Sequence, residues 1–420
     1  MAFYAADRTL TVAQRTGNSG PWTFNTPRDG AGNQVKLSGD TRNNIAMSID
    51  SIGQLHIIAN VNISAMNYWR SASPTDPTNL KFANSLVIPV QVNKNGERTD
   101  GEGFVSFPRF LTDQNGVLRL NFRSGWTNAS MMFSYEFNAD TGRWHNPVGV
   151  GTPVLNGWGS GGNPNHGVFT DEFRYNPADG HYYLSYTWQR NGTVASAHTV
   201  NMIRTQDFTT WSTALGEPIT MPALHSTDAA IVAPVPTNSG LLNSNIKTGF
   251  DNTGKPTVIY THDFEKKTAI SVARIDEKNT GWNISTLTPW NERIDLTNPN
   301  NFTKLLLGSG TTHKMPNLTV SYAYQNEVRE LTIGDGTEIG SSMLISDRAK
   351  LVGVMPESLM KTEFPNAAYR ITSRTATSDS DTGTIILRWE AGAMIADGSE
   401  PNPKNYPQEG STLLFSVAKK

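Results

Sequence analysis

The residues best suited to acid–base chemistry are a tyrosine and a histidine two positions apart, Tyr260 and His262. They belong to a run of β-branched and aromatic residues that predicts a strand, and side chains two positions apart leave the same face of a strand. A phenol and an imidazole on one face can transfer a proton to or from a bound ligand. The structural alternative has equal weight: Tyr260 would pack between sheets, and His262 would bond a backbone carbonyl.

Three further side chains could bind a charged ligand or move its proton. A guanidinium pairs with a carboxylate through two parallel hydrogen bonds, so Arg42 and Arg123 are candidates for binding an acid, with a structural salt bridge as the alternative. His166 lies in the Gly- and Asn-rich segment 159–172, ahead of a predicted strand. Loops at one end of a rigid scaffold commonly carry its site, although a loop histidine can also be merely solvated.

Two loop tryptophans, Trp126 and Trp158, could stack on the apolar face of a sugar ring or pack in the interior. The neighbouring carboxylates Asp171 and Glu172 would face opposite sides of a strand, which argues against the paired carboxylates of a glycosidase. His225 and His313 are weaker loop candidates. We expect structural roles for His56 and His181, which lie in or at strands just after turns.

The elements that must position these residues recur along the chain. A polar turn containing Asp or Asn and Gly is followed by a strand of alternating aromatic and β-branched residues. The copies lie roughly 55 to 75 residues apart, which suits one four-stranded propeller blade with its loops. They occupy residues 50–61, 113–122, 177–188, 251–262 and 380–390, with a weaker copy at 324–333.

A second recurring element is a polar turn closed by tryptophan, which follows some copies by roughly 25 to 30 residues. A buried tryptophan after such a turn can hold the outer strands of a blade together. These turns resemble degenerate versions of the Asp-box turn of sialidase-like propellers. They occupy residues 138–147, 204–213 and 277–286.

This repetition predicts an all-β fold, a seven-bladed β-propeller formed by residues 1–420 as one domain. Six copies are recognisable, and the two chain ends would complete a further blade by pairing residues 411–420 with N-terminal strands, so that neither sheet edge is left open. Amphipathic helices are scarce, since only 357–364 has the pattern of a short helix. The alternative architecture, a pair of β-sandwiches, would not produce so long a period.

Composition limits the classes of partner. The chain has 420 residues and a formal net charge of −2, which gives no reason to expect nucleic acid or a membrane as a partner. Cysteine is absent, so disulfides and thiolate metal sites are excluded. The wealth of Asn, Thr, Ser and Gly favours a secreted or periplasmic protein, although no signal peptide begins the chain. No cofactor is required; the Asp-rich segment 377–383 could hold a structural Ca²⁺, but it lacks the ligand spacing of a defined calcium loop.

Six segments of the chain form an ordered set: 42–71, 105–128, 177–191, 239–287, 385–391 and 411–417. In this order they resemble segments of a family of BNR-repeat seven-bladed propellers that includes ulvan lyases and the lyases and rhamnosidases that act on rhamnose-glucuronate linkages. The resemblance implies β-elimination at a uronic acid: a base removes the proton on C5, and cations or protonated groups neutralise the neighbouring carboxylate.

The chain departs from the family pattern at several site positions. The two histidines expected in the first blade fall on Arg42 and Asn62, and an expected arginine falls on Gln189 unless Arg190 replaces it. An expected tyrosine falls near Phe169 or Thr170, whereas the arginine at 123 and the Tyr260–His262 pair are kept. We therefore predict catalytic roles for Tyr260, His262, His166 and Arg123, and substrate binding by Arg42, Asn62, Gln189, Arg190, Trp126 and Trp158.

The function that these observations favour is cleavage of a uronic-acid-containing polysaccharide by a polysaccharide lyase, with an acidic polysaccharide or oligosaccharide as the partner. One alternative is a glycoside hydrolase that removes rhamnose from a glucuronate, and the other is a glycan-binding propeller without catalysis. The loss of both first-blade histidines, at Arg42 and Asn62, is the best support for the last.

Overall fold

The structure is a computed structural model, and the regular elements of its described residues are strands apart from one turn of 3₁₀ helix, Val194–Ser196. None of the described elements is a helix long and apolar enough to cross a membrane. The described residues are 1–17, 20–37, 43–74, 76, 79–83, 104–159, 164–227, 230–243, 245–251, 253–287, 292–296, 305–307, 318–324, 327–333, 339–345, 368–377, 382–391 and 413–419.

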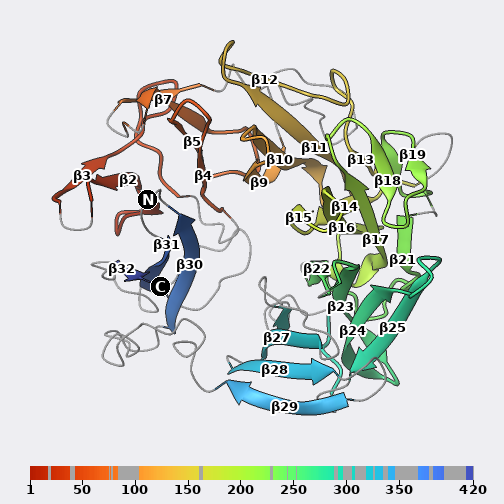
Figure 1. Ribbon diagram of the computed structural model, residues 1–420. Coiled ribbons are helices and arrows are strands. Elements are labelled where there is room, and N and C mark those ends of the chain that lie inside the picture. The colour runs from red at the N-terminus through yellow and green to blue at the C-terminus, as the bar shows by residue number, and fades with distance from the viewer. Residues whose placement is uncertain are drawn as a thin grey trace. The chain divides into compact units, whose positions relative to one another are not determined.

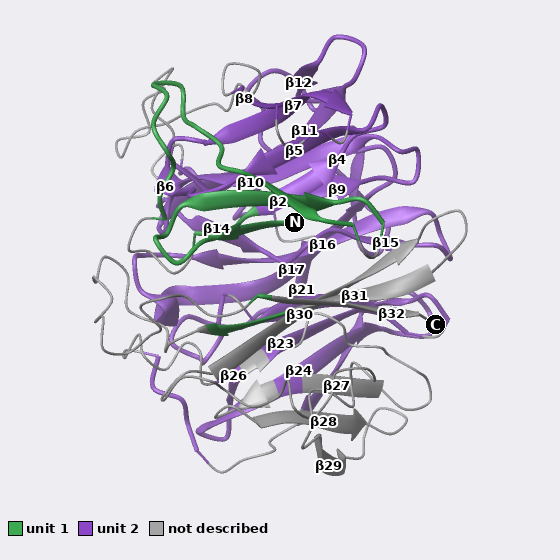
Figure 2. Ribbon diagram, turned by 90° about the vertical axis from the view of Figure 1, so that its left-hand side faces the viewer, with its two compact units in different colours: residues 1–45, 345–420 green, residues 46–344 purple. Residues whose placement is uncertain are grey.

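The described strands form seven sheets, which are divided between two compact units, and most sheets join strands that follow one another in the chain (Figure 1). Whether the sheets close into seven blades of one domain stays a prediction. Unit 1 comprises residues 1–45 and 345–420, and unit 2 comprises residues 46–344 (Figure 2).

Unit 1 contains two three-stranded sheets. The expected pairing of the C-terminal segment with N-terminal strands is wrong for the described residues, because β32 pairs with β31 through the contiguous register Gly383–Lys419 to Arg388–Leu414. One sheet has the order β1 (Ala2–Tyr4), β2 (Leu10–Arg15), β3 (Trp22–Asn25), and the other β30 (Ala368–Thr377), β31 (Thr382–Ala391), β32 (Leu414–Lys419).

Unit 2 contains five sheets, which we number in chain order. Sheet 1 has the order β4 (Ala46–Ile49), β5 (Gln54–Ile58), β7 (Tyr68–Pro74), β8 (Leu80–Phe82). Sheet 2 has the order β20 (Ala223–Leu224), β13 (Leu155–Asn156), β11 (Ala129–Asn138), β10 (Leu118–Trp126), β9 (Val105–Thr112), β6 (Asn62–Ser64), with β12 (Arg143–His145) also on β11.

The other three sheets of unit 2 are formed by residues 167–345. Sheet 3 has the order β14 (Gly167–Thr170), β16 (His181–Gln189), β17 (Ala197–Thr205), β18 (Trp211–Thr213), β19 (Pro218–Ile219), with β15 (Arg174–Asn176) on β16 and β21 (Ile231–Ala233) on β17. Sheet 4 is β22 (Ile246–Phe250), β23 (Pro256–Phe264), β24 (Lys267–Ile275), β25 (Trp282–Leu287), and sheet 5 is β26 (Leu305–Leu307), β27 (Leu318–Tyr324), β28 (Glu327–Ile333), β29 (Ile339–Ile345).

The predicted Asp–Gly turn is confirmed at Asp50, Asp113 and Asp251. At each, one carboxylate oxygen accepts hydrogen bonds from the amides two and four residues on, at 2.8 to 3.1 Å. The glycine three residues on has a φ of 77 to 83° and donates to the carbonyl of the aspartate. Only glycine adopts that conformation without strain, which explains the fixed Asp-x-x-Gly spacing before the central strands of sheets 1, 2 and 4.

The three tryptophan turns are confirmed as well. Trp144 lies in β12, Trp211 in β18 and Trp282 in β25. These three strands pair with β11, β17 and β24, the strands that follow the central strand of each of these sheets. Trp144 and Trp211 are buried, and Trp282 packs partly buried against the core. The tryptophans therefore anchor these outer strands, as the repeat predicts.

Consecutive sheets of unit 2 pack face to face through apolar clusters. The cluster between sheets 1 and 2 includes Tyr68 and Phe122, and the cluster between sheets 2 and 3 includes Leu155 and Trp188. Tyr183, Tyr260 and their neighbours join sheets 3 and 4, and a fourth cluster of Ile270, Leu305 and others joins sheets 4 and 5. Both faces of the inner sheets are buried in this way, and the buried residues of their strands include polar ones such as Asn121, Ser185 and Asn201.

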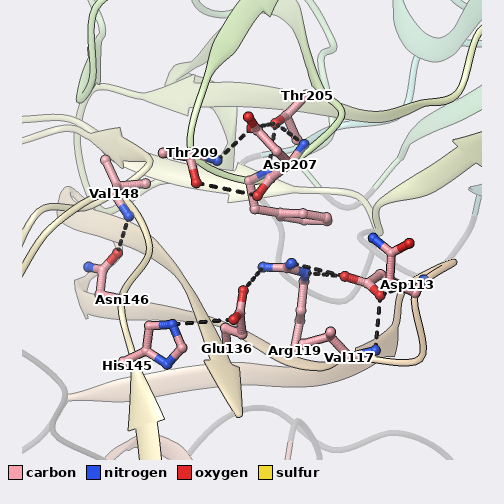
Figure 3. A network of polar contacts seen from close by, with 12 residues as sticks. Asp113, Val117, Arg119, Glu136, His145, Asn146, Val148, Thr205, Asp207 and Thr209 are labelled. Atoms are coloured by element: carbon pink, nitrogen blue, oxygen red, sulfur yellow. Dashed lines mark hydrogen bonds and ion pairs between the residues drawn. The ribbon is translucent and has the colours of Figure 1, made fainter. Parts of the chain in front are cut away.

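One buried ion network reinforces the contact between sheets 2 and 3. The guanidinium of Arg119 contacts the carboxylates of Asp113, at 2.9 Å, and Glu136, at 3.0 Å (Figure 3). It also lies 4.0 Å from the centre of the Phe208 ring in sheet 3. Glu136 continues the network to the exposed His145 at 3.3 Å. The turn aspartate of sheet 2 thus has a second function, as the counter-ion of a buried arginine.

Candidate active site

The segment before β14 is fixed by close contact with the backbone of sheet 2. The amide of His166 donates to the carbonyl of Gly157 at 2.6 Å, and its carbonyl accepts from the amide of Ser130 at 3.1 Å. A Cβ atom at Gly157 would overlap the carbonyl oxygen of His166, and one at Gly167 would overlap that of Thr127. The glycines on both sides of His166 therefore permit an approach that holds the histidine in one place.

Three imidazoles meet at this point. The ring of His166 stacks on that of His225, which follows β20, with centroids 4.1 Å apart. It meets His198, near the start of β17, edge-on at 5.1 Å. The indole of Trp188 lies edge-on to the ring of His225, with centroids 6.3 Å apart. We call these three histidines the imidazole cluster.

Hydrogen bonding decides which nitrogen of His166 carries a lone pair. Nδ1 of His166 lies 3.1 Å from the carbonyl oxygen of Pro164 and must donate to it, so in the neutral ring Nε2 keeps its lone pair. Within the described part of the chain, no hydrogen-bond partner meets the buried Nε2 of His198 or Nδ1 of His225. His166 therefore keeps a lone pair on Nε2 that can accept a proton, and beside it lie two buried ring nitrogens, one each of His198 and His225, without a described partner.

The cluster is held in its neutral form. Burial, together with repulsion from His225 and Arg190, lowers the pKa of His166 to about 4. Burial, together with repulsion from His166 and Arg190, lowers the pKa of His198 to about 4, and burial also lowers the pKa of His225. No carboxylate is among the described groups that shift the first two values. The surroundings therefore disfavour a positive charge on these imidazoles.

Gln189 ends β16 beside the cluster, and its side chain is 1% exposed. In the sheet it pairs with Gly167 on one side and Ala197 on the other, the residues next to His166 and His198. Its amide group donates to the carbonyls of Thr127, at 3.3 Å, and Asn191, at 2.7 Å, and accepts from Asn243 at 2.7 Å. Through these hydrogen bonds Gln189 connects sheets 2 and 3 with the segment that precedes β22. The next residue, Arg190, is exposed.

Tyr260 and His262 share one face of β23, as predicted, with ring centroids 5.6 Å apart. Nε2 of His262 is 2.7 Å from the hydroxyl of Ser271, which in turn contacts the hydroxyl of Thr286 at 2.8 Å. Tyr260 is buried in the core between sheets 3 and 4, and burial raises its pKa to about 12. The structure brings these two rings together in sheet 4, whereas the imidazole cluster belongs to sheets 2 and 3.

Arg123 and Asn62 lie in one row across sheet 2. Ser106 of β9 pairs with Arg123 of β10 on one side and with Asn62 of β6 on the other, and directly opposed residues share a face of a sheet. The guanidinium of Arg123 is buried between two aromatic rings, 4.9 Å from the centre of Phe107 and 4.5 Å from that of Phe169. Phe169 belongs to β14, so Arg123 lies at the strand that His166 precedes.

The other predicted site residues are dispersed. Trp126 ends β10 with its ring 4.6 Å from that of Phe104, and Trp158 packs against the core between sheets 1 and 2. Among the described residues no group of three histidine, aspartate or glutamate side chains could hold a metal ion. Arg42, His313 and the turn of the Asp-rich segment 377–383 lie outside the described residues.

Comparison with known proteins identifies the family. The sequence model of BNR repeat-containing family members matches residues 1–290. The chain belongs to the BNR repeat-containing family. No curated protein sequence gives a significant match.

Solved structures place this member of the BNR repeat-containing family in a fold class. The polysaccharide lyase Uly1 superposes with a TM-score of 0.61 and 16% identity over 100% of this chain and 87% of the other. An ulvan lyase of family PL25 gives 0.58 and 12%, and its complex with -[GlcA(1-4)Rha3S]- gives 0.56 and 13%, each over 100% of this chain and 93% of the other. The likeness confirms the predicted all-β propeller fold.

Sequence reasoning on this BNR-repeat protein placed His166 correctly in a loop beside the strand ends but missed the cluster. The sequence pattern supports His225 only weakly and does not single out His198. The signal for both is indirect, since 59 residues separate His166 from His225 and only their strand pairing brings them together. His56 is the structural residue that was predicted: it is fully buried, with ring nitrogens 2.7 Å from the Tyr68 hydroxyl and 3.0 Å from the Asp50 carboxylate.

The lowered pKa values predict acid sensitivity of the folded state. Between pH 6.5 and 4 the unfolded chain protonates His166 and His198 while the folded chain does not, so the free energy of unfolding should fall as the pH falls through this window. Urea titrations at pH 6.5 and pH 4 should show a smaller loss in His166→Gln than in the parent. His145→Gln, an exposed histidine, should behave like the parent; equal losses in all three would contradict the lowered pKa.

Proposed function

We propose that the chain is a polysaccharide lyase that cleaves a uronic-acid-containing polysaccharide by β-elimination at the imidazole cluster. The observation that carries the proposal is the cluster itself: neutral imidazoles with available ring nitrogens, beside the exposed Arg190. The whole-chain likeness to polysaccharide lyases, one of them bound to a glucuronate-rhamnose sulfate unit, supports the class of substrate.

In this proposal His166 is the base. Its Nε2 takes the proton from C5 of the uronate, the C5–H electron pair forms the C4–C5 double bond, and the C4–O4 bond breaks. O4 leaves with the proton that the imidazolium returns, so no water is consumed and the product is an unsaturated uronate. The bond from Nδ1 of His166 to the Pro164 carbonyl fixes the tautomer that this step needs.

Arg190 is proposed to neutralise the uronate carboxylate. The resemblance to the family places an arginine at Gln189, but that amide is buried and fully engaged, whereas the next residue carries an exposed guanidinium. Arg190 already lowers the pKa of His166 and His198 through its charge. When it pairs with a bound carboxylate, this repulsion weakens and His166 becomes a better base.

The other predicted residues take supporting positions in the proposal. Arg123 and Asn62 lie in the row of sheet 2 in which Arg123 contacts Phe169 of β14. Trp126 and Trp158 remain candidates for contact with further sugar units. Tyr260 is buried and held in its neutral form, so we assign Tyr260 and His262 to the support of sheet 4 rather than to proton transfer.

The test is incubation with ulvan, gum arabic, rhamnogalacturonan and bacterial exopolysaccharides. Lyase action predicts a rise in the ultraviolet absorbance of unsaturated uronate products, identified by mass spectrometry. Reducing sugar released without that absorbance would show a hydrolase instead. Binding without any product would show a non-catalytic glycan-binding propeller, and either result would overturn the proposal.

Two replacements of Arg190 distinguish the contribution of its positive charge from that of its guanidinium geometry. Arg190→Ala should lower kcat/KM about 10²-fold, because carboxylate neutralisation is lost where charge develops in the transition state. Arg190→Lys should retain part of the activity, since an ammonium keeps the charge but not the two-pronged geometry. Steady-state kinetics by product absorbance measure both, with Arg143→Ala on the exposed edge strand β12 as the control. An unchanged kcat/KM in Arg190→Ala would exclude this role.

A further inference from the structure

The pairing of β16 with β17 changes register at one residue next to the imidazole cluster. From Tyr182–Thr205 to Thr187–Val200 the partners follow one register, but Trp188 pairs with His198 and Gln189 with Ala197. Thr199 is therefore an extra residue, a β-bulge, and its φ is +50°. Such a φ is unusual for a β-branched residue and costs on the order of 1–3 kcal/mol, so the surroundings must impose it.

The bulge decides which way His198 faces. In the register of the rest of the strand, Thr199 would stand opposite Trp188 and His198 opposite Gln189. Because side chains alternate between the faces of a strand, His198 would then leave the face of Trp188. With the bulge it shares that face, where Trp188 lies 6.3 Å from His225 and His198 lies 5.1 Å from His166.

Hydrogen bonds hold the bulge in place. The amide of Thr199 donates to the carbonyl of Val235 at 2.8 Å, and its hydroxyl donates to the carbonyl of His198 at 2.8 Å. The side-chain amide of Asn201, which is 2% exposed, donates to the Thr199 hydroxyl at 3.2 Å and to the carbonyls of Thr199 and Tyr186 at 3.3 Å. One buried asparagine thus bonds both the bulged strand and its partner.

We propose that Thr199 and Asn201 are positioning residues, which direct the side chain of His198 toward His166 and His225. In this proposal His198 is also a further residue of the reaction, because its Nε2 accepts a hydrogen bond from a hydroxyl of the saccharide. The kinetic half of this inference rests on the proposed function, whereas the placement of His198 does not. β-Bulges next to functional sites commonly redirect one side chain in this manner.

The experiment compares a loosened bulge with a removed one. Asn201→Leu removes the bonds that hold Thr199, so the strand can slip into the unbulged register. Deletion of Thr199 gives a strand without an extra residue, in which His198 still stands opposite Trp188. The double variant, Asn201→Leu with Thr199 deleted, should therefore restore what Asn201→Leu loses, which a merely stabilising role of Asn201 would not predict.

Two readouts are needed. NMR titration of isotope-labelled histidine, with His198→Gln for assignment, should show the pKa of His198 near 4 in the parent and in the Thr199 deletion, and raised toward 6.5 in Asn201→Leu. The kcat/KM should fall about 100-fold in Asn201→Leu, the usual cost of a misplaced site group, and largely recover in the double variant.

Each outcome decides one part. An unchanged pKa of His198 in Asn201→Leu would overturn the positioning role. A raised pKa with unchanged activity would overturn the part of His198 in the reaction. If Asn201→Leu fails to fold, Asn201→Ser, which also removes the side-chain amide that bonds Thr199, takes its place, and an unchanged pKa of His198 in that variant would overturn the positioning role. If the parent has no lyase activity, the proposed function fails, while the titrations still test the placement.

Discussion

Replacing His166 with glutamine should lower kcat about 10²- to 10⁴-fold on the polysaccharide that the parent cleaves, the usual effect of removing a general base. Glutamine can keep a hydrogen bond to the Pro164 carbonyl but cannot accept the C5 proton. KM should change little, because in the proposal the carboxylate is bound by Arg190 and not by His166. Initial rates of ultraviolet absorbance measure both constants.

The pH dependence of the parent completes this prediction. Because the pKa of His166 is lowered to about 4, its imidazole is neutral over the whole neutral range, and kcat/KM should fall only as the pH approaches 4. His145→Gln should match the parent, since His145 is an exposed residue of β12. Full activity in folded His166→Gln would exclude His166 as the base and direct attention to His198 or His225.

The fold could be predicted from sequence because its signals are local. The Asp-x-x-Gly turn needs one carboxylate and one glycine within four residues, and the structure reproduces it at Asp50, Asp113 and Asp251 with the same hydrogen bonds. The tryptophan turns are equally local. The pairing of the chain ends is not, since it depends on contacts across the whole sequence, and it was wrong for the described residues.

The site was predicted only in part, because it depends on register and close backbone contact. Side-chain alternation was enough to place Tyr260 and His262 on one face. It could not reveal that the hydrogen bonds of Gln189 are internal, nor that an extra residue at Thr199 turns His198 toward His166. Those facts follow from pairing between strands, which a single sequence leaves open by one residue, and one residue reverses the face of a side chain.

Replacing Asp113 with alanine should lower the free energy of unfolding by about 3–5 kcal/mol, the usual effect of removing one partner of a buried ion pair. Asp113 and Arg119 are both nearly inaccessible, and the guanidinium contacts both Asp113 and Glu136 (Figure 3). It also lies against the Phe208 ring. Glu136 alone would have to compensate the arginine. The variant also loses the two amide hydrogen bonds of the turn.

A matched turn in unit 1 separates these two contributions. Asp29 accepts the same pair of amide hydrogen bonds, at 2.9 and 2.8 Å, but its carboxylate is solvent-exposed, so Asp29→Ala should lower the free energy of unfolding far less than Asp113→Ala. Asp113→Asn should fall between the two, since an amide oxygen can cap the turn but cannot neutralise Arg119. Urea unfolding followed by tryptophan fluorescence gives all three values. If Asp113→Ala and Asp29→Ala proved equally mild, the network between sheets 2 and 3 would contribute nothing beyond the turn, and the stability of that contact would rest on apolar packing alone.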